Sequence, residues 1–140
     1  MVGRHEFDVS HVDAAIDFVI AHAAEDRAQT ASYSRVFAAA GLPAPQDLHM
    51  GGESQLVSQF MEAFHYRCRD RELPPLDALV VQVLGPRMNL PGTGYFRVNN
   101  LVDPLGERGS DAERVEATRF WEDEKLRCRE WGVSSRRGRR

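Results

Sequence analysis

The chain has 140 residues, of which 42% are hydrophobic and 28% charged, as is usual for a single globular domain in water. No apolar run approaches the roughly 18 residues of a membrane-spanning helix, and the N-terminus lacks the apolar core of a signal peptide. We therefore expect a cytoplasmic protein with no membrane partner, and no motif predicts a cofactor. The two cysteines, Cys68 and Cys128, fall in predicted helices and are expected to be buried thiols.

The formal net charge is −3, but the charges are unevenly placed. Four arginines lie within residues 136–140, so the rest of the chain is more acidic than the total suggests. A domain that binds duplex DNA needs several cations facing the phosphates. The charge balance therefore favours a protein partner, while a local basic patch would still allow binding to DNA.

Two helices are predicted in the first part of the chain. Ser10 begins a helix that should end near Arg27, because apolar residues recur at the helical period between them. A shorter helix over residues 33–40 follows a cap at Thr30 or Ser32. Gly41 directly follows this helix, where glycine is the preferred terminating residue.

Two longer helices are predicted further along. The first spans residues 53–72, and its apolar stripe repeats every four residues: Leu56, Phe60, Phe64 and Cys68. The second opens with a capping box formed by Ser110 and Glu113. We expect this last helix to run to about Trp131 and to end at Gly132.

The clearest β-signal lies between these two helices. Residues 76–84 are apolar at nearly every position, which suits a strand covered on both faces. Residues 95–98 alternate like a partner strand, and turn-forming residues precede them. The two strands predict an antiparallel hairpin with a long loop over residues 85–94, which is either a binding element or simply mobile.

Together these elements predict an α+β fold, with about four helices around a small antiparallel sheet and a winged-helix-like arrangement as one option. The expected domain organisation is a flexible lead-in over residues 1–9, a single globular domain over residues 10–132 and a disordered basic tail over residues 133–140.

Four phrases of the sequence stand out, at residues 33–38, 74–81, 90–96 and 120–122. Together they resemble an uncharacterised family of small bacterial and phage-associated proteins. No activity attaches to that family, so the resemblance implies no site residues. It does imply a setting, namely an inhibitor or adaptor in a phage–host or mobile-element context.

The order of elements is also similar to the winged-helix domain of alkylguanine-DNA alkyltransferases and their alkyltransferase-like relatives. Those proteins carry a Pro-Cys-His-Arg motif or a version with the cysteine replaced, whereas residues 74–77 read Pro-Pro-Leu-Asp. Alkyl transfer is therefore not implied. The resemblance implies a layout only, with a positioning helix over residues 33–40, a recognition helix over residues 52–72 and a wing over residues 76–98.

This layout supplies the DNA-binding alternative, in which polar side chains reach base edges and arginines meet phosphates. The residues concerned are Ser54, Gln55, Ser58, Gln59, Arg67, Arg69, Arg71 and Arg87. Met88 and Asn89, in the loop over residues 85–94, are candidates to contact either kind of partner. Trp131 is a candidate anchor for a protein partner, because tryptophan is enriched at the centres of interfaces.

A metal-dependent nuclease is the second alternative. Asp123 and Lys125 match half of a nuclease motif, but they belong to a predicted helix rather than a strand. Asp77, at the head of the apolar run, is either half of an acidic pair or a cap at the strand entry. Three possible zinc ligands, His65, Cys68 and Cys128, have no evident fourth. We therefore predict no catalytic residue and no metal ligand, and expect a non-enzymatic binding module that acts through a protein partner.

Overall fold

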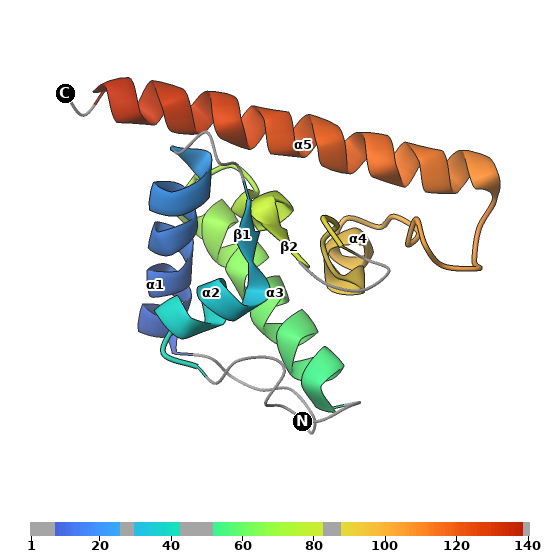
Figure 1. Ribbon diagram of the computed structural model, residues 1–140, viewed down its shortest axis with the longest axis horizontal. Helices are drawn as coiled ribbons and strands as arrows, with labels where there is room; N and C mark the ends of the chain where they lie inside the picture. Colours follow the sequence, from blue (N-terminus) through green and yellow to red (C-terminus); the bar gives the residue numbers. More distant parts are fainter. Residues whose placement is uncertain (1–7, 26–29, 43–51, 83–87, 139–140) are drawn as a thin grey trace.

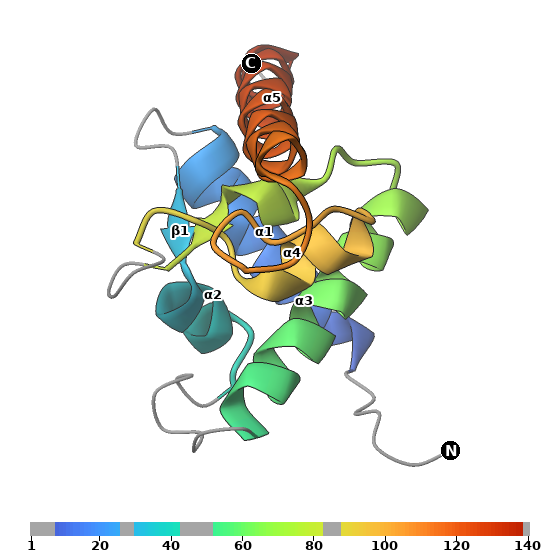
Figure 2. The same cartoon turned by 90° about the vertical axis from the view of Figure 1, so that its right-hand side faces the viewer.

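The computed structural model describes residues 8–25, 30–42, 52–82 and 88–138. Its helices are α1 (Val9–Val19), continued by the π-helix η1 (Ile20–Ala24), then α2 (Tyr33–Ala39), α3 (Gly52–Asp70), the 3-10 helix η3 (Leu76–Leu79), α4 (Thr93–Val98) and α5 (Asp111–Gly138). Two short strands, β1 (Ala31–Ser32) and β2 (Val80–Val81), pair in parallel. Figures 1 and 2 show α5 lying across one side of a body formed by the other helices.

Local capping explains where several helices begin and end. The Ser32 hydroxyl accepts a hydrogen bond from the Arg35 amide and so caps α2. Ser110 and Glu113 form the reciprocal capping box predicted for the last helix. Gly41 adopts a φ of 77° after α2, a backbone conformation that favours glycine. The cap of α1, however, is Asp8 and not Ser10, because the Asp8 carboxylate accepts from the Ser10 amide.

Two groups of buried side chains form the core. The larger one joins α1, α2, α3 and η3, and it includes the predicted stripe residues Phe60, Phe64 and Cys68, all fully buried. The smaller one lies between η3, α4 and the first half of α5, around Phe96 and Trp121. Both groups contain residues of η3 or β2, so this short segment lies at the centre of the molecule.

The predicted antiparallel sheet is wrong. Residues 76–79 form the 3-10 helix η3, and only Val80 and Val81 form a strand, which pairs in parallel with β1. Pro74 and Pro75 start the turn, because their carbonyls accept from the Leu76 and Ala78 amides. Every residue of η3 is buried, and a short buried apolar run looks the same in sequence whether it is a strand or a helical turn.

The predicted partner strand is also wrong, because residues 95–98 belong to α4. Gly92 precedes this helix, and its amide donates to the Tyr33 hydroxyl at 2.6 Å. Tyr95 and Phe96 are adjacent and both buried, whereas a strand would send neighbouring side chains to opposite faces. Without the hairpin, the expected wing is absent from the described part of the chain.

The last helix does not end at Gly132. Instead α5 continues to Gly138, so the predicted disordered tail is helical as far as that residue. Gly132 is needed for packing, since a Cβ at this position would overlap the Ala24 backbone at the end of η1. Even α5, although 28 residues long, is too rich in charge to cross a membrane, and no other described helix has the length and apolar character to do so.

Candidate functional site

A buried polar pair lies between α3 and η3. His65 Nδ1 and Asp77 Oδ2 are 3.0 Å apart, and the two residues are 8% and 2% exposed. The hydrogen bond that His65 donates to the Asp77 carboxylate raises the pKa of His65, against the effect of burial, which lowers it. Asp77 is thus neither a strand-entry cap nor a solvated acid. It is the buried partner of a histidine that lies 12 positions earlier in the chain.

Glu124 adds a second buried carboxylate from α5. It is only 8% exposed, and burial raises its pKa. The Arg127 guanidinium lies 3.2 Å from Glu124 Oε2, but this oxygen has no hydrogen bond within the described residues. The charges of Asp77 and His65 also act on Glu124, one raising and the other lowering its pKa, so these three residues form one electrostatic unit. We call His65, Asp77 and Glu124 the polar cluster.

Neutral groups surround the polar cluster. Burial raises the pKa of Tyr95 well above its ordinary value, and its hydroxyl has no hydrogen-bond partner within the described residues. Burial likewise raises the pKa of Cys68 to about 12 and keeps Cys128 protonated, with its thiol donating to the Pro75 carbonyl. A thiol that stays protonated is a poor nucleophile. No group of three or more His, Cys, Asp or Glu in the described residues has the geometry of a metal site.

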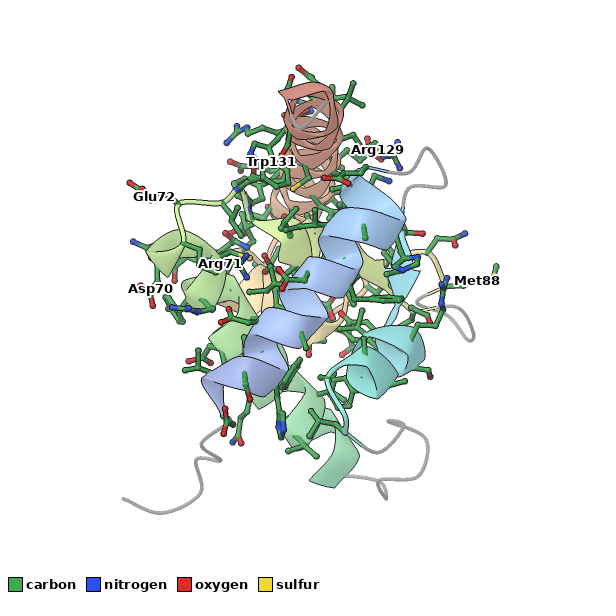
Figure 3. The ribbon with its side chains drawn as sticks, turned by 90° about the vertical axis from the view of Figure 1, so that its left-hand side faces the viewer. Asp70, Arg71, Glu72, Met88, Arg129 and Trp131 are labelled. Carbon is green, nitrogen blue, oxygen red and sulfur yellow. The ribbon has the colours of Figure 1, made fainter. Side chains whose placement is uncertain are left out.

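Two arginines, Arg67 in the last turn of α3 and Arg71 just after it, bond to carboxylates of α1. Arg67 donates to both carboxylate oxygens of Asp13, at 2.9 and 3.1 Å. Arg71 bridges Asp13 and Asp17, at 3.2 and 3.0 Å. Figure 3 shows Arg71 on the side of α3 nearest α1. These bonds hold the pKa of Asp13 below its ordinary value, so two of the arginines expected to meet phosphates are already neutralised by carboxylates.

The structure does not bring the other predicted binding residues together into one surface. Arg69 lies over the Tyr66 ring at 5.8 Å. Ser58 is half-buried against α4, where a Cβ on Gly94 would stand 3.2 Å from its hydroxyl, and Gln59 is half-buried too. Ser54 and Gln55 lie in α3, but their side chains fall outside the described residues, as does the whole of Arg87.

The remaining predicted residues lie on different sides of the molecule. Met88 is 55% exposed and points away from the body (Figure 3), and Asn89 has a left-handed backbone with φ of 69°. Trp131 is half-buried and packs against the larger core group, which leaves only part of its ring for a partner. Met88 is therefore the most accessible apolar residue among the predicted binding positions.

The solvent-exposed side of α5, opposite the side that packs on the body, was not predicted as a site. Its exposed apolar residues are Val115, Leu126 and Val133, which are 58%, 55% and 41% exposed. They are separated by 11 and 7 residues, about three and two helical turns, so they lie along one line. The inner face, with Ala117, Trp121, Glu124, Cys128 and Gly132, is buried against the body. The spacing of the three apolar residues was the signal in the sequence that could have revealed this face.

A shallow groove of about 430 Å³ adjoins one end of this outer face. Its lining residues are Pro104, Arg114, Val115, Thr118, Arg119 and Glu122. The groove is open and lies beside Val115, so the apolar line on α5 leads into a hollow with charged edges. We call this line and groove together the outer face of α5.

Comparison with protein-family models, with curated proteins and with solved structures finds no match for this chain. Its function must therefore be argued from its own residues.

Proposed function

We propose that the protein is a non-enzymatic binding module that acts through a protein partner, and that it binds this partner with the outer face of α5. The observation that carries the proposal is the line of Val115, Leu126 and Val133, each more than 40% exposed on a helix whose other face is buried. One face of α5 packs on the body, and the apolar residues on the opposite face are free of that packing. A partner protein can bind an exposed apolar helix face of this kind.

Charge pairing within the chain favours a protein partner over DNA. The Arg67 and Arg71 guanidiniums already bond to Asp13 and Asp17, so a phosphate would have to compete with two carboxylates. A protein partner would not need to displace Asp13 and Asp17 from these arginines, because apolar anchors supply most of the binding energy in many interfaces. The phage–host setting remains a prediction that rests on sequence resemblance alone.

Site-specific photo-crosslinking tests the proposal in cells that naturally produce the chain. A photoreactive amino acid at Leu126 should yield one discrete crosslinked protein species, because this position lies on the proposed interface. The same amino acid at Val9, which is 54% exposed on α1, serves as the matched control and should yield none. The absence of a discrete species from Leu126 would contradict the proposal.

Met88 provides the rival position. It is as exposed as Leu126 but lies in the loop that the sequence singled out as a binding element. If the discrete species arises from Met88 and not from Leu126, the partner binds that loop and the assignment to α5 is wrong.

A further inference from the structure

The polar cluster has one member, Glu124, on the inner face of α5 and two members, His65 and Asp77, in the body. Asp77 bonds His65 through Oδ2, while its other oxygen, Oδ1, is buried without a hydrogen bond to any described residue. Glu124 brings a second carboxylate from α5, also with an unbonded buried oxygen. Nearby, Trp121 Nε1 donates to the Ala78 carbonyl at 2.8 Å and fixes α5 to η3. On the same face of α5, the Cys128 thiol donates to the Pro75 carbonyl, so the two residues that flank Glu124 bond to the backbone on both sides of Asp77.

The charge balance of this cluster depends on bound protons. When His65 is protonated and Glu124 is neutral, the imidazolium compensates Asp77. When both protons are lost, two buried carboxylates remain, and Arg127, which is 68% exposed and lies 3.2 Å from Glu124 Oε2, compensates only one of them. Burial of uncompensated charge is strongly unfavourable, and separation of α5 from η3 is the direct way to rehydrate Glu124.

We propose that proton binding at His65 and Glu124 controls how stably α5 packs against η3. We call the packed arrangement the seated state and the separated arrangement the released state. The protonated cluster holds the helix in place. Loss of the protons sets like charges against each other under the helix and favours its release. This control acts on the inner face of α5 and is independent of whether the outer face binds a partner.

The cluster and the titratable or charged groups that interact with it electrostatically come from four elements. They are His65, Cys68 and Arg69 of α3, Asp77 of η3, Tyr95 of α4, and Asp123, Glu124, Arg127 and Cys128 of α5. The raised pKa values of Tyr95 and of the two thiols keep those groups neutral. The pKa of His65 is raised by its hydrogen bond with Asp77 and that of Glu124 by burial, so both groups hold their protons to a higher pH in the folded chain than in water.

The direction of the effect follows from these raised pKa values. A released α5 exposes His65 and Glu124 to water, where their pKa values return toward 6.5 and 4.5. The seated state binds the protons more tightly, so seating is strongest at low pH and weakens as the pH rises through the raised values. Each unit of pKa difference changes the ratio of seated to released chain about tenfold.

Fluorescence of Trp121 provides the test, in a W131F chain that leaves Trp121 as the only tryptophan. We expect acrylamide quenching of Trp121 to be greater at about pH 9 than at about pH 6, because the seated state loses its protons as the pH rises. Glu124→Gln in the same background mimics the protonated carboxyl and should remove most of this increase. Glu122→Gln, which neutralises an exposed glutamate of the outer face, is the matched control and should retain it.

Either of two results would overturn the proposal: quenching that does not change with pH in the parent chain, or an unchanged increase in Glu124→Gln. If W131F does not fold, hydrogen exchange of the wild-type chain gives the same answer. Amides of residues 117–128, corrected for the intrinsic pH dependence of exchange, should lose protection at the higher pH in the wild type and not in Glu124→Gln. Equal protection at both pH values would again contradict the proposal.

Discussion

Gly132 of α5 lies directly against the backbone of Ala24, the last residue of η1. A Cβ at position 132 would overlap the Ala24 carbonyl, so the two helices approach more closely than any other residue would allow. The contact joins the second half of α5 to the end of the first helical segment. It also gives a structural reason for a glycine inside a helix, where glycine is otherwise unfavourable.

Gly132→Ala should destabilise the protein by about 2 kcal/mol, because α5 must move away from η1 to admit the methyl group. At a solvent-exposed helix position the same change would instead stabilise by about 1 kcal/mol. Denaturant unfolding measures whether the free energy of unfolding of the variant is lower or higher than that of the wild type. Ser134→Ala, at an exposed position two residues further on, is the control and should not destabilise. A Gly132→Ala protein more stable than the wild type would show that the two helices do not touch there.

The pKa of His65 should depend on Asp77. The hydrogen bond that His65 donates to the Asp77 carboxylate is the largest cause of its raised pKa, and burial opposes it. Asp77→Asn removes the negative charge and leaves the burial, so the pKa of His65 should fall, and below its ordinary 6.5 if burial then dominates. NMR titration of the imidazole resonances measures it. An unchanged pKa in Asp77→Asn would mean that the two residues do not pair in solution.

Asp13 should stabilise the packing of α1 on α3. Asp13→Asn removes the charge bonded by Arg67 and Arg71, and a partly exposed pair of this kind contributes about 1 kcal/mol, less at high salt. The pKa of Asp13 is lowered in the folded chain, so this contribution is present above about pH 4 and is lost as the pH falls through the folded value. Asp17→Asn, at a 64% exposed carboxylate with a single arginine bond, should cost less. Urea unfolding of both variants at two salt concentrations compares them.

Both cysteines should be unreactive in the folded protein. Burial raises the pKa of Cys68 to about 12 and keeps Cys128 protonated as well, so little thiolate exists near neutral pH. A chromogenic disulfide reagent should therefore react with two thiols only after denaturation. Rapid reaction of either thiol in the native protein would place it at the surface, contrary to its burial.

The helices α1, α2, α3 and α5 could be predicted because their signals are local, whereas α4 and η3 were predicted as strands. The Ser110–Glu113 capping box, the cap at Ser32 and the four-residue stripe of α3 each depend on residues within a few positions, and the structure confirms them. The hairpin could not be predicted in the same way. Leu76, Ala78 and Leu79 are apolar residues that would be buried in a strand and are buried in the 3-10 helix that they form, so the sequence pattern alone does not separate the two.

The sites were hidden by contacts between residues far apart in the chain. From the sequence, Arg67 was expected to be available for a phosphate, but it bonds to Asp13, which lies 54 positions earlier in the chain. From the sequence, Gly132 was expected to end the last helix, but it lies inside the helix and packs against Ala24. The outer face of α5 is different, because the spacing of Val115, Leu126 and Val133 is visible in the sequence. Their significance became clear only when the opposite face of the same helix proved to be buried.

The most direct test of the proposed function is the affinity of the partner, once captured, for a Leu126→Glu variant. Leu126 is 55% exposed, so this change should leave the stability of the fold nearly unaltered while it places a charge in the middle of the proposed interface. We predict that the dissociation constant measured by calorimetry rises at least about tenfold, equivalent to ~1.4 kcal/mol. Met88→Glu, at an equally exposed position outside the interface, should leave it unchanged. Equal affinity of wild-type and Leu126→Glu chains would contradict the assignment of binding to the outer face of α5.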